Sequence, residues 1–265
     1  MTHYIQSSKQ YLDSLIVNTF TESTENDGDI LVVDSSTASG FSFTTPTASL
    51  GKYYCDDLFG SASSNNGIFA MTSVGTHAGA SPQQQQPVAL HSGITRIFNS
   101  AANVVAGYQS ASAVLFQNLQ INATNPATFI FRFAPLGTAL NVTTNVGLGS
   151  DFSTSNPANS LFFRYSTNIA PQNVWNLVLD NVSVFTCINN TGSKANTWMK
   201  ATFQRTGNLT YTATLIDIVA NTTDLFSGSV NSNSLSLNLG GSVACTSSAS
   251  SKYLDIDFIS ITLSN

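Results

Sequence analysis

Short apolar runs alternate with turn-forming residues along most of the chain after Asp29. Within several runs every second residue is apolar: Phe129, Phe131 and Phe133 share one face of a predicted strand, and Ile130 and Arg132 share the other. A period of two residues is typical of half-buried β-strands. Many short strands separated by turns predict an all-β, two-sheet antiparallel jelly-roll sandwich.

The predicted strands are short and are separated by polar segments rich in Gly, Ser, Asn and Pro, such as residues 60–67 and 76–87. No fixed-period repeat is present. The strands comprise residues 30–33, 67–73, 89–98, 112–122, 128–134, 160–166, 174–180, 182–187, 197–205, 209–218 and 253–263.

The segment "KANTWMKATFQRTGNLTYTATL" (194–215) predicts the clearest hairpin. Met199, Ala201 and Phe203 fall on one face of its first strand, and residues 205–208 supply the Gly/Asn turn. Trp198 begins an interior strand and is expected to be in the core.

Residues 1–29 differ from the predicted sandwich, which covers residues 30–265. Apolar side chains recur there at near-helical spacing, and the polar run "TESTENDGD" follows. We expect a short helix or arm and a linker, either a frayed terminus or an arm that anchors the protein to a partner or pairs subunits. Asp13 interrupts the apolar run "YLDSLIVNTF", so we expect no secretion signal.

The composition restricts the possible partners. Charged residues make up 9% of the 265 residues, against roughly 25% in an average soluble domain, and Ser, Thr and Asn take their place. Such a surface suits a chain that packs against many neighbours or works outside a cell. With a net charge of −5 and no basic cluster, we expect no nucleic-acid partner. No apolar run is long enough to span a membrane.

The acidic residues give little support to catalysis. Both glutamates, Glu22 and Glu25, lie in the N-terminal linker, whereas a glycoside hydrolase needs two carboxyl groups flanking the scissile bond. Only Asp255 and Asp257 share a strand face, about 7 Å apart, and a solvated edge face is the simpler interpretation. We therefore expect no catalytic residue.

Metal and thiol chemistry is also weakly supported, and we expect no cofactor. Asp56 with Asp57, and Asp255 with Asp257, are weak calcium candidates, although a polar turn is the favoured interpretation of the first pair. His3, His77 and His91 are isolated. The cysteines, Cys55, Cys187 and Cys245, are expected to be buried thiols, which fits assembly in a reducing cytoplasm.

A carbohydrate site needs an aromatic platform with amide and hydroxyl groups beside it. Trp175, flanked by Asn173 and Asn176, is the best surface candidate, with Arg164 and Tyr165 as possible neighbours. The alternative is that Trp175 packs in the core.

Four segments match the order of elements in a known fold. "NSLFFRYSTN", "NVWNLVLDN", "NTWMKATFQRTGNLTYTATL" and "YLDIDFISITL" resemble the concanavalin A-like lectin/glucanase sandwich, in the versions found in structural proteins of tailed phages and other large viruses. Residues 90–109, "LHSGITRIFNSAANVVAGYQ", resemble a His-Pro-Gly-x-x-Arg segment of those proteins, with Ser92 where proline is commonest. The resemblance covers about residues 30–265.

With the composition, this resemblance implies a non-enzymatic virion structural protein, a capsid decoration or cement protein or a tail, fibre or neck appendage of a bacteriophage or other large virus. Such a protein is assembled in the host cytoplasm, exposed on the particle and joined to other virion proteins through the 1–29 arm. Viral appendages are often trimers, so a homotrimer is the favoured oligomer. The alternatives are a lectin-like module that binds host-surface glycan and, third, a glycoside hydrolase, because the same fold hosts all three.

Overall fold

The computed structural model describes residues 30–33, 41–44, 52–56, 69–77, 83–84, 91, 93–99, 102–135, 141–180, 182–245 and 252–264. The chain divides into two units, Met1–Leu50 and Gly51–Asn265. In the first unit, β1 (Ile30–Val33) and β2 (Phe41–Thr44) form an antiparallel two-stranded sheet. The predicted arm and helix (1–29) lie outside the described residues.

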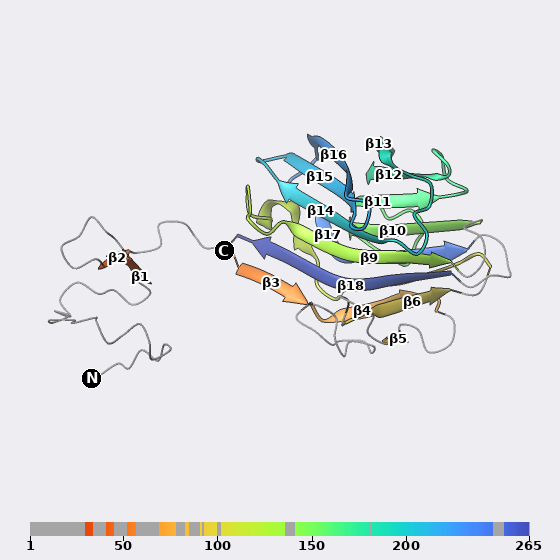
Figure 1. Cartoon of the computed structure of the whole chain (residues 1–265), viewed down its shortest axis with the longest axis horizontal. Coiled ribbons are helices and arrows are strands. Elements are labelled where there is room, and N and C mark those ends of the chain that lie inside the picture. Colours follow the sequence, from red (N-terminus) through yellow and green to blue (C-terminus); the bar gives the residue numbers. More distant parts are fainter. Residues whose placement is uncertain are drawn as a thin grey trace. The chain divides into compact units, whose positions relative to one another are not determined.

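The second unit is a sandwich of two eight-stranded sheets (Figure 1). Sheet 1 has the order β13-β12-β11-β10-β17-β7-β4, with β8 paired to β17, and sheet 2 has the order β16-β15-β14-β9-β18-β6-β5, with β3 paired to β18. All strand pairs in both sheets are antiparallel. The predicted all-β, two-sheet class is confirmed.

Sheet 1 consists of β4 (Met71–Gly75), β7 (Val104–Ser110), β8 (Val114–Leu115), β10 (Val142–Gly149), β11 (Leu161–Ser166), β12 (Val174–Leu179), β13 (Val182–Thr191) and β17 (Ser236–Cys245). Sheet 2 consists of β3 (Lys52–Asp56), β5 (Gln83–Gln84), β6 (Thr95–Asn99), β9 (Ala127–Pro135), β14 (Trp198–Arg205), β15 (Thr210–Asp217), β16 (Thr222–Ser229) and β18 (Lys252–Leu263). A 3-10 turn, Phe116–Asn118, follows β8. No helix in the described part of the chain could cross a membrane.

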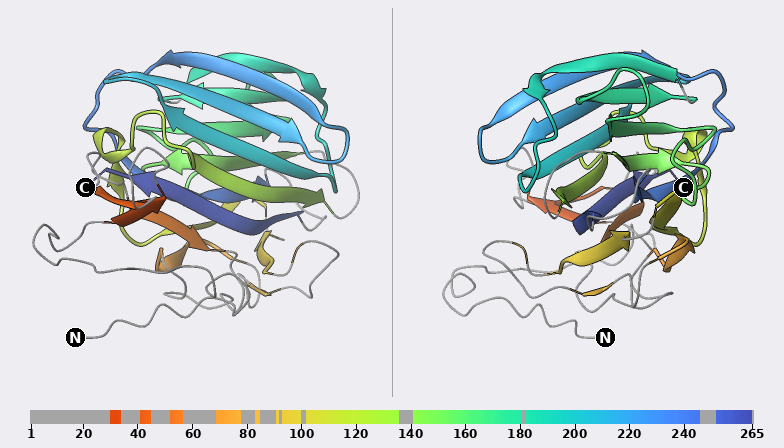
Figure 2. Two further views of the ribbon diagram at one scale, coloured as in Figure 1. Left: turned by 60° about the vertical axis from the view of Figure 1, so that its left-hand side comes forward. Right: turned by 90° about the vertical axis from the view of Figure 1, so that its right-hand side faces the viewer.

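The core lies between the two sheets, which face each other in the views of Figure 2. Phe129, Phe131 and Phe133 of β9 are buried, as the alternation predicts, and Phe131 packs edge-on against Trp175 of sheet 1 with ring centroids 5.7 Å apart. Burying one such side chain stabilises the fold by about 1.5–3 kcal/mol. The aromatic residues on both inner faces therefore hold the sheets together.

The predicted hairpin is present as β14 and β15, which pair without a break from Met199 opposite Asp217 to Arg205 opposite Tyr211. Met199, Ala201 and Phe203 are buried in the core. Trp198 is buried, as the sequence predicts, but on the opposite, outer face of sheet 2, where the ring of His91 stacks on it.

The outer face of sheet 1 is covered by residues 150–160, a segment that we call the strap. The backbone N–H of Phe152 donates a hydrogen bond to Gln109 Oε1 (2.8 Å), and Asn145 Nδ2 donates to the carbonyl oxygen of Ser155 (3.2 Å). Because the strap lies on one face and the core on the other, β10 and β11 are buried on both faces.

Glycine allows the strap to approach the sheet closely. A Cβ atom on Gly107 would lie 2.2 Å from the carbonyl oxygen of Phe152. We expect Gly107→Ala to destabilise the fold by about 1–3 kcal/mol, because the strap must move outward. Gly149→Ala is the matched control, because its Cβ would meet only side-chain atoms of the strap at 3.2 Å and beyond. Urea unfolding measures both; equal loss in the two variants would contradict the close approach at Gly107.

Candidate functional site

The structure places most of the predicted carbohydrate-binding residues inside the molecule. Trp175 is 0% exposed, and its Nε1 donates a hydrogen bond to the carbonyl oxygen of Ser193 (3.2 Å). Arg164, Tyr165 and Asn176 are also buried, and only Asn173 is exposed. A ring without accessible surface cannot stack on a sugar. This corrects the prediction of a surface platform and agrees with the alternative, that Trp175 packs in the core.

The sequence predicted that Asp255 lies on a solvated edge face, and this prediction is wrong. Asp255 lies on β18, an interior strand of sheet 2, and is 0% exposed. Arg96 donates to its two carboxylate oxygens (2.7 and 2.9 Å), and Arg132 donates from two nitrogens to Oδ2 (2.7 and 3.2 Å). Asp255 therefore joins β6, β18 and β9 through two guanidinium groups, and its oxygens are not available to a substrate.

His91 lies beside the Asp255 cluster. Its ring stacks on Trp198 with centroids 3.8 Å apart, and its Nδ1 is 2.7 Å from Asp257 Oδ2. Arg132 lies over the same Trp198 ring, 4.8 Å from its centroid. An Asp–His pair resembles two members of a catalytic triad, but a triad also needs a nucleophile hydrogen-bonded to the histidine. Among the described residues, the hydrogen-bond partner of the His91 ring is Asp257, and no serine or cysteine takes the place of a nucleophile.

The calcium candidates form no metal site in the described part of the chain. No group of three or more His, Cys, Asp or Glu side chains there could hold a metal ion. Asp255 and Asp257 are engaged by arginine and histidine. Asp57 and the side chain of Asp56 lie outside the described residues.

Two of the cysteines are buried free thiols, as expected. Burial raises the pKa of the Cys187 thiol, and the nearby carboxylate of Asp224 raises it further. Cys187 therefore stays protonated and is not an activated nucleophile. The side chain of Cys55 lies outside the described residues.

One side of the sandwich is closed by the edge strands of the two sheets. β13 is the last strand of sheet 1, β16 is the last strand of sheet 2, and the two lie next to each other at the top of the view in Figure 1. The rings of Phe185 on β13 and Phe226 on β16 stack with centroids 5.1 Å apart. This contact is apolar and joins the two sheets.

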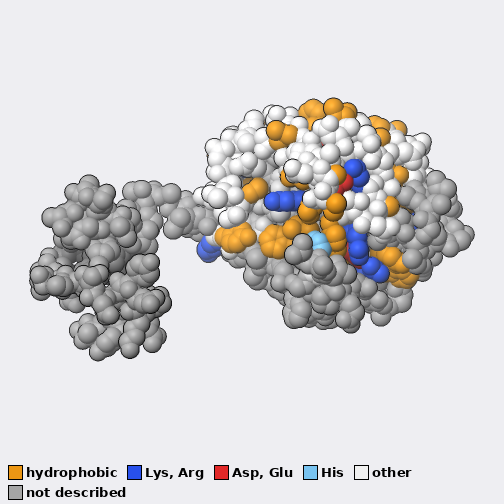
Figure 3. Space-filling model, in the orientation of Figure 1, with side chains coloured by type: hydrophobic (Ala, Val, Ile, Leu, Met, Phe, Trp, Pro, Cys, Tyr) orange, Lys and Arg blue, Asp and Glu red, His pale blue; other side chains and the backbone are white. Residues whose placement is uncertain are grey.

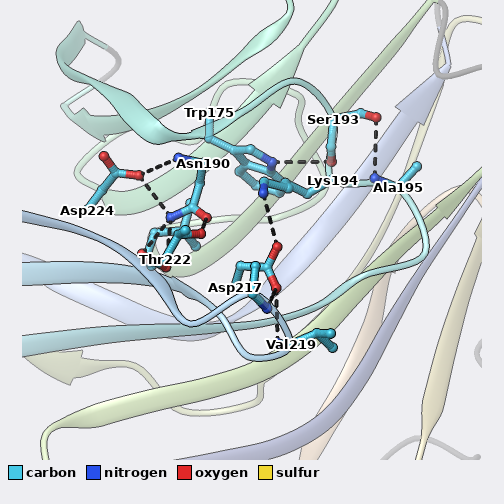
Figure 4. Close-up of polar contacts among 11 residues, drawn as sticks. Trp175, Asn190, Ser193, Lys194, Ala195, Asp217, Val219, Thr222 and Asp224 are labelled. Atoms are coloured by element: carbon cyan, nitrogen blue, oxygen red, sulfur yellow. Dashed lines mark hydrogen bonds and ion pairs between the residues drawn. The ribbon is translucent and has the colours of Figure 1, made fainter.

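A buried carboxylate also fastens β13 to β16. Asp224 accepts hydrogen bonds from the backbone N–H groups of Ile188 (2.9 Å), Asn189 (3.0 Å) and Asn190 (2.9 Å). The Asn190 side chain also donates to Asp224 (2.9 Å), and its Oδ1 accepts from the hydroxyl of Thr222 (2.8 Å) (Figure 4). A carboxylate that accepts several N–H bonds is well satisfied despite burial.

A second fastening lies close by. Lys194 Nζ is 3.0 Å from Asp217 Oδ2, and the other oxygen of Asp217 accepts from the backbone N–H groups of Val219 and Ala220 (Figure 4). These bonds fix the turn between β15 and β16. The closed side of the sandwich is therefore held in one conformation by polar groups that point inward.

Several exposed side chains at this closed side are apolar, although exposed polar residues such as Asn189 and Ser227 lie on the same strands. Ile188 is 76% exposed, Leu225 66% and Val219 82%. We call the whole set the apolar rim: Val182, Val184, Phe185 and Ile188 on β13, Leu225 on β16, and Ile218 and Val219 in the turn. Figure 3 shows hydrophobic side chains gathered at the top of the unit, where these strands lie. The one charged residue of β13 and β16, Asp224, is turned inward.

Large apolar side chains that gather on the surface of a soluble domain often mark an interaction site. The apolar rim is the candidate functional site, because the sequence-based sugar platform is buried and the acidic residues of β18 are saturated by arginine and histidine. Its chemistry suits contact with another protein surface.

Comparison with known proteins defines the fold. No family model and no curated protein matches the sequence. The structure is similar to arcelin-5, a lectin-like defense protein from Phaseolus vulgaris (TM-score 0.52, 9% identity, covering 81% of this chain and 98% of that one). It is also similar to lectin I from Ulex europaeus in complex with the methyl glycoside of α-L-fucose (0.50, 13%, 80% and 99%). A protein of unknown function from Shewanella oneidensis is similar as well (0.50, 16%, 83% and 89%).

At these identities the likeness establishes the fold. The second unit is a lectin-type jelly-roll sandwich, so the concanavalin A-like part of the sequence resemblance is confirmed.

Proposed function

We propose that this chain is a non-enzymatic structural protein of a virion, a capsid decoration protein or an appendage of the tail, fibre or neck, that works through contacts between subunits. The observation that carries the proposal is the apolar rim, a set of exposed apolar side chains at the closed side of the sandwich, on strands that Asp224 fastens together. Specific, stable protein interfaces bury about 1,200 Å² or more, with an apolar centre.

The virion setting rests on the sequence. The segments that resemble viral structural proteins become strands β6, β7, β11, β12, β14, β15 and β18 of the sandwich. A surface poor in charge suits dense packing against neighbouring subunits, because few charges must be desolvated. In this proposal residues 1–29 anchor the sandwich to other virion proteins.

Particle incorporation tests this proposal. Antibodies against the purified chain should label the surface of the virus particles whose genome encodes the chain. Particles assembled with Ile188→Lys/Val219→Lys in place of the native chain should lose the label, because two charges would be buried at the interface. Ile121→Lys, an exposed isoleucine outside the apolar rim, is the control. Particles that never carry the chain, or that carry the double variant normally, would refute the proposal.

The second candidate is a lectin-like module that binds host-surface glycan. It is favoured by the fold alone, since the Ulex europaeus lectin of the same architecture holds a fucose glycoside. A glycan array with the purified chain decides between the two: retention of a sugar by a chain that is absent from particles supports the lectin. The buried Trp175 predicts that any retained sugar is held by other residues.

A further inference from the structure

We propose that a second copy of this chain pairs with it through the free edge of β16, so that sheet 2 continues from one copy into the next. This inference rests on the proposed function: it identifies a second copy of the chain as the partner and the edge of β16 as the surface in contact. β16 is the last strand of sheet 2, and among the described residues no strand pairs with its outer edge. Its eight residues pair with β15 without a register shift, from Thr210 opposite Ser229 to Asp217 opposite Thr222.

The hydrogen-bond pattern shows which backbone groups of β16 point outward. Val230 N donates to the carbonyl oxygen of Leu209 (2.8 Å) in register with the β15–β16 pairs. Inward and outward residues alternate along an antiparallel strand. The amide and carbonyl groups of Leu225, Ser227 and Ser229 therefore face away from β15, toward the outer edge.

The two ends of this edge differ. At Thr223 the outward carbonyl oxygen accepts a hydrogen bond from Asn189 Nδ2 (2.7 Å), so the side chains of β13 cover the start of β16. β13 itself breaks register twice against β12, and Asp224 occupies the amides of residues 188–190. β-Bulges and capped amides are devices that prevent strand addition. The segment of the closed side that remains suited to pairing is 225–229.

This segment has none of the devices that blunt a strand edge. Soluble proteins protect their edges with lysine, proline, bulges or inward-pointing charges. The sequence "LFSGS" (225–229) holds no charge and no proline, and Leu225 is 66% exposed on its surface. Unlike the start of β16 at Thr223, this part of the strand is regular and uncharged.

A second copy fits this edge better than a charged partner does. Two chains of net charge −5 repel each other at long range. The segment itself carries no charge, so bringing it against its own copy adds no local repulsion. A charged partner strand would instead lose water from its charges without gaining an opposite charge.

The residue order is compatible with a two-fold axis. In antiparallel pairing centred on Ser227, Leu225 lies opposite Ser229 and Phe226 lies opposite Gly228 of the other copy, so bulky residues meet small ones. The same residues contribute from both copies, as a two-fold contact requires. All outward amides of the segment would then be paired across the axis.

Sedimentation velocity of the full chain, with hydrogen exchange of the amides at 225–229, tests the inference. The native chain should form dimers or even-numbered assemblies. Ser227→Pro should weaken self-association at least about tenfold, or about 1.4 kcal/mol, because it removes an outward amide while leaving the β15 ladder intact. Leu225→Lys should act likewise through charge. Ile121→Lys should associate as the native chain does, and circular dichroism of all variants should be unchanged.

The outcomes separate this inference from the proposed function. A native chain that is monomeric or forms closed trimers, or a Ser227→Pro variant that associates normally, overturns the β16 pairing. If Ile188→Lys/Val219→Lys is still lost from particles in that case, the proposed function survives without it. Association that depends on Ser227 and Leu225 in a chain absent from particles supports the pairing and refutes the virion role.

Discussion

Asp255→Asn should lower the free energy of unfolding by about 3 kcal/mol, the lower end of the range for breaking a buried ion pair. The substitution leaves Arg96 and Arg132 without the carboxylate that both contact at 2.7 Å. The loss stays at the lower end because these arginine side chains are 21% and 20% exposed, so water can reach them. At about 2–4 °C per kcal/mol for a domain of this size, the midpoint of thermal unfolding should fall by roughly 6–12 °C.

Urea unfolding with a conserved m-value measures this loss. Asp151→Asn is the matched control, since Asp151 is only half-buried and bonds within its own turn to Ser153. We expect the control to lose about 1 kcal/mol or less. An Asp255→Asn variant as stable as its control would show that the two arginines do not depend on the carboxylate.

Asp224→Ala should cost about 3 kcal/mol and detach β13 from β16. The substitution removes the acceptor of three backbone N–H groups and of the Asn190 side chain, and Asn190 is fully buried. Each buried donor left without a partner costs about 1–3 kcal/mol. Asp224→Asn should lose less, because one acceptor oxygen remains.

Hydrogen exchange resolved by residue distinguishes this local effect from general destabilisation. The amides of 188–190 should exchange faster in Asp224→Ala than the global loss of stability explains. Val184→Ala, at an exposed position of the same strand, should leave those amides slow. Uniform acceleration over all strands would contradict a local fastening by Asp224.

The period-two pattern predicted the strands with one apolar face, and β9, β14 and β15 match it closely. It failed for β10, β17 and β7, whose sequences "VTTNVGLG", "SLNLGGSVAC" and "VVAGYQS" are rich in Gly, Ser, Thr and Asn. β10 and β17 are buried on both faces, so apolar and polar positions do not alternate. Residues 112–122, which were predicted as one strand, form the short β8, a 3-10 turn from which Phe116 enters the core, and two isolated β-bridges at Leu119 and Ile121.

The two tryptophans show why the site was harder to predict than the fold. Alternation assigns Trp175 and Trp198 to one face of a strand, but it does not say whether that face meets the other sheet or the outside. Trp175 faces Phe131 in the core, whereas Trp198 stacks on His91 on the outer face. The apolar rim was missed for a related reason: β16 was not predicted, and strand 182–187 gave no sign that it ends a sheet.

The amino-acid sequence by itself determined the all-β class, the hairpin of β14 and β15 and the shortage of catalytic side chains, because these follow from local pattern and composition. The tertiary structure decided which faces are buried, which aspartates meet arginines and which strands lie at an edge. Those properties depend on residues far apart in the chain, such as Asp255 with Arg96 and Arg132, or Asp224 with the amides of 188–190. Strand order brings them together, and strand order is not encoded in the period of any single segment.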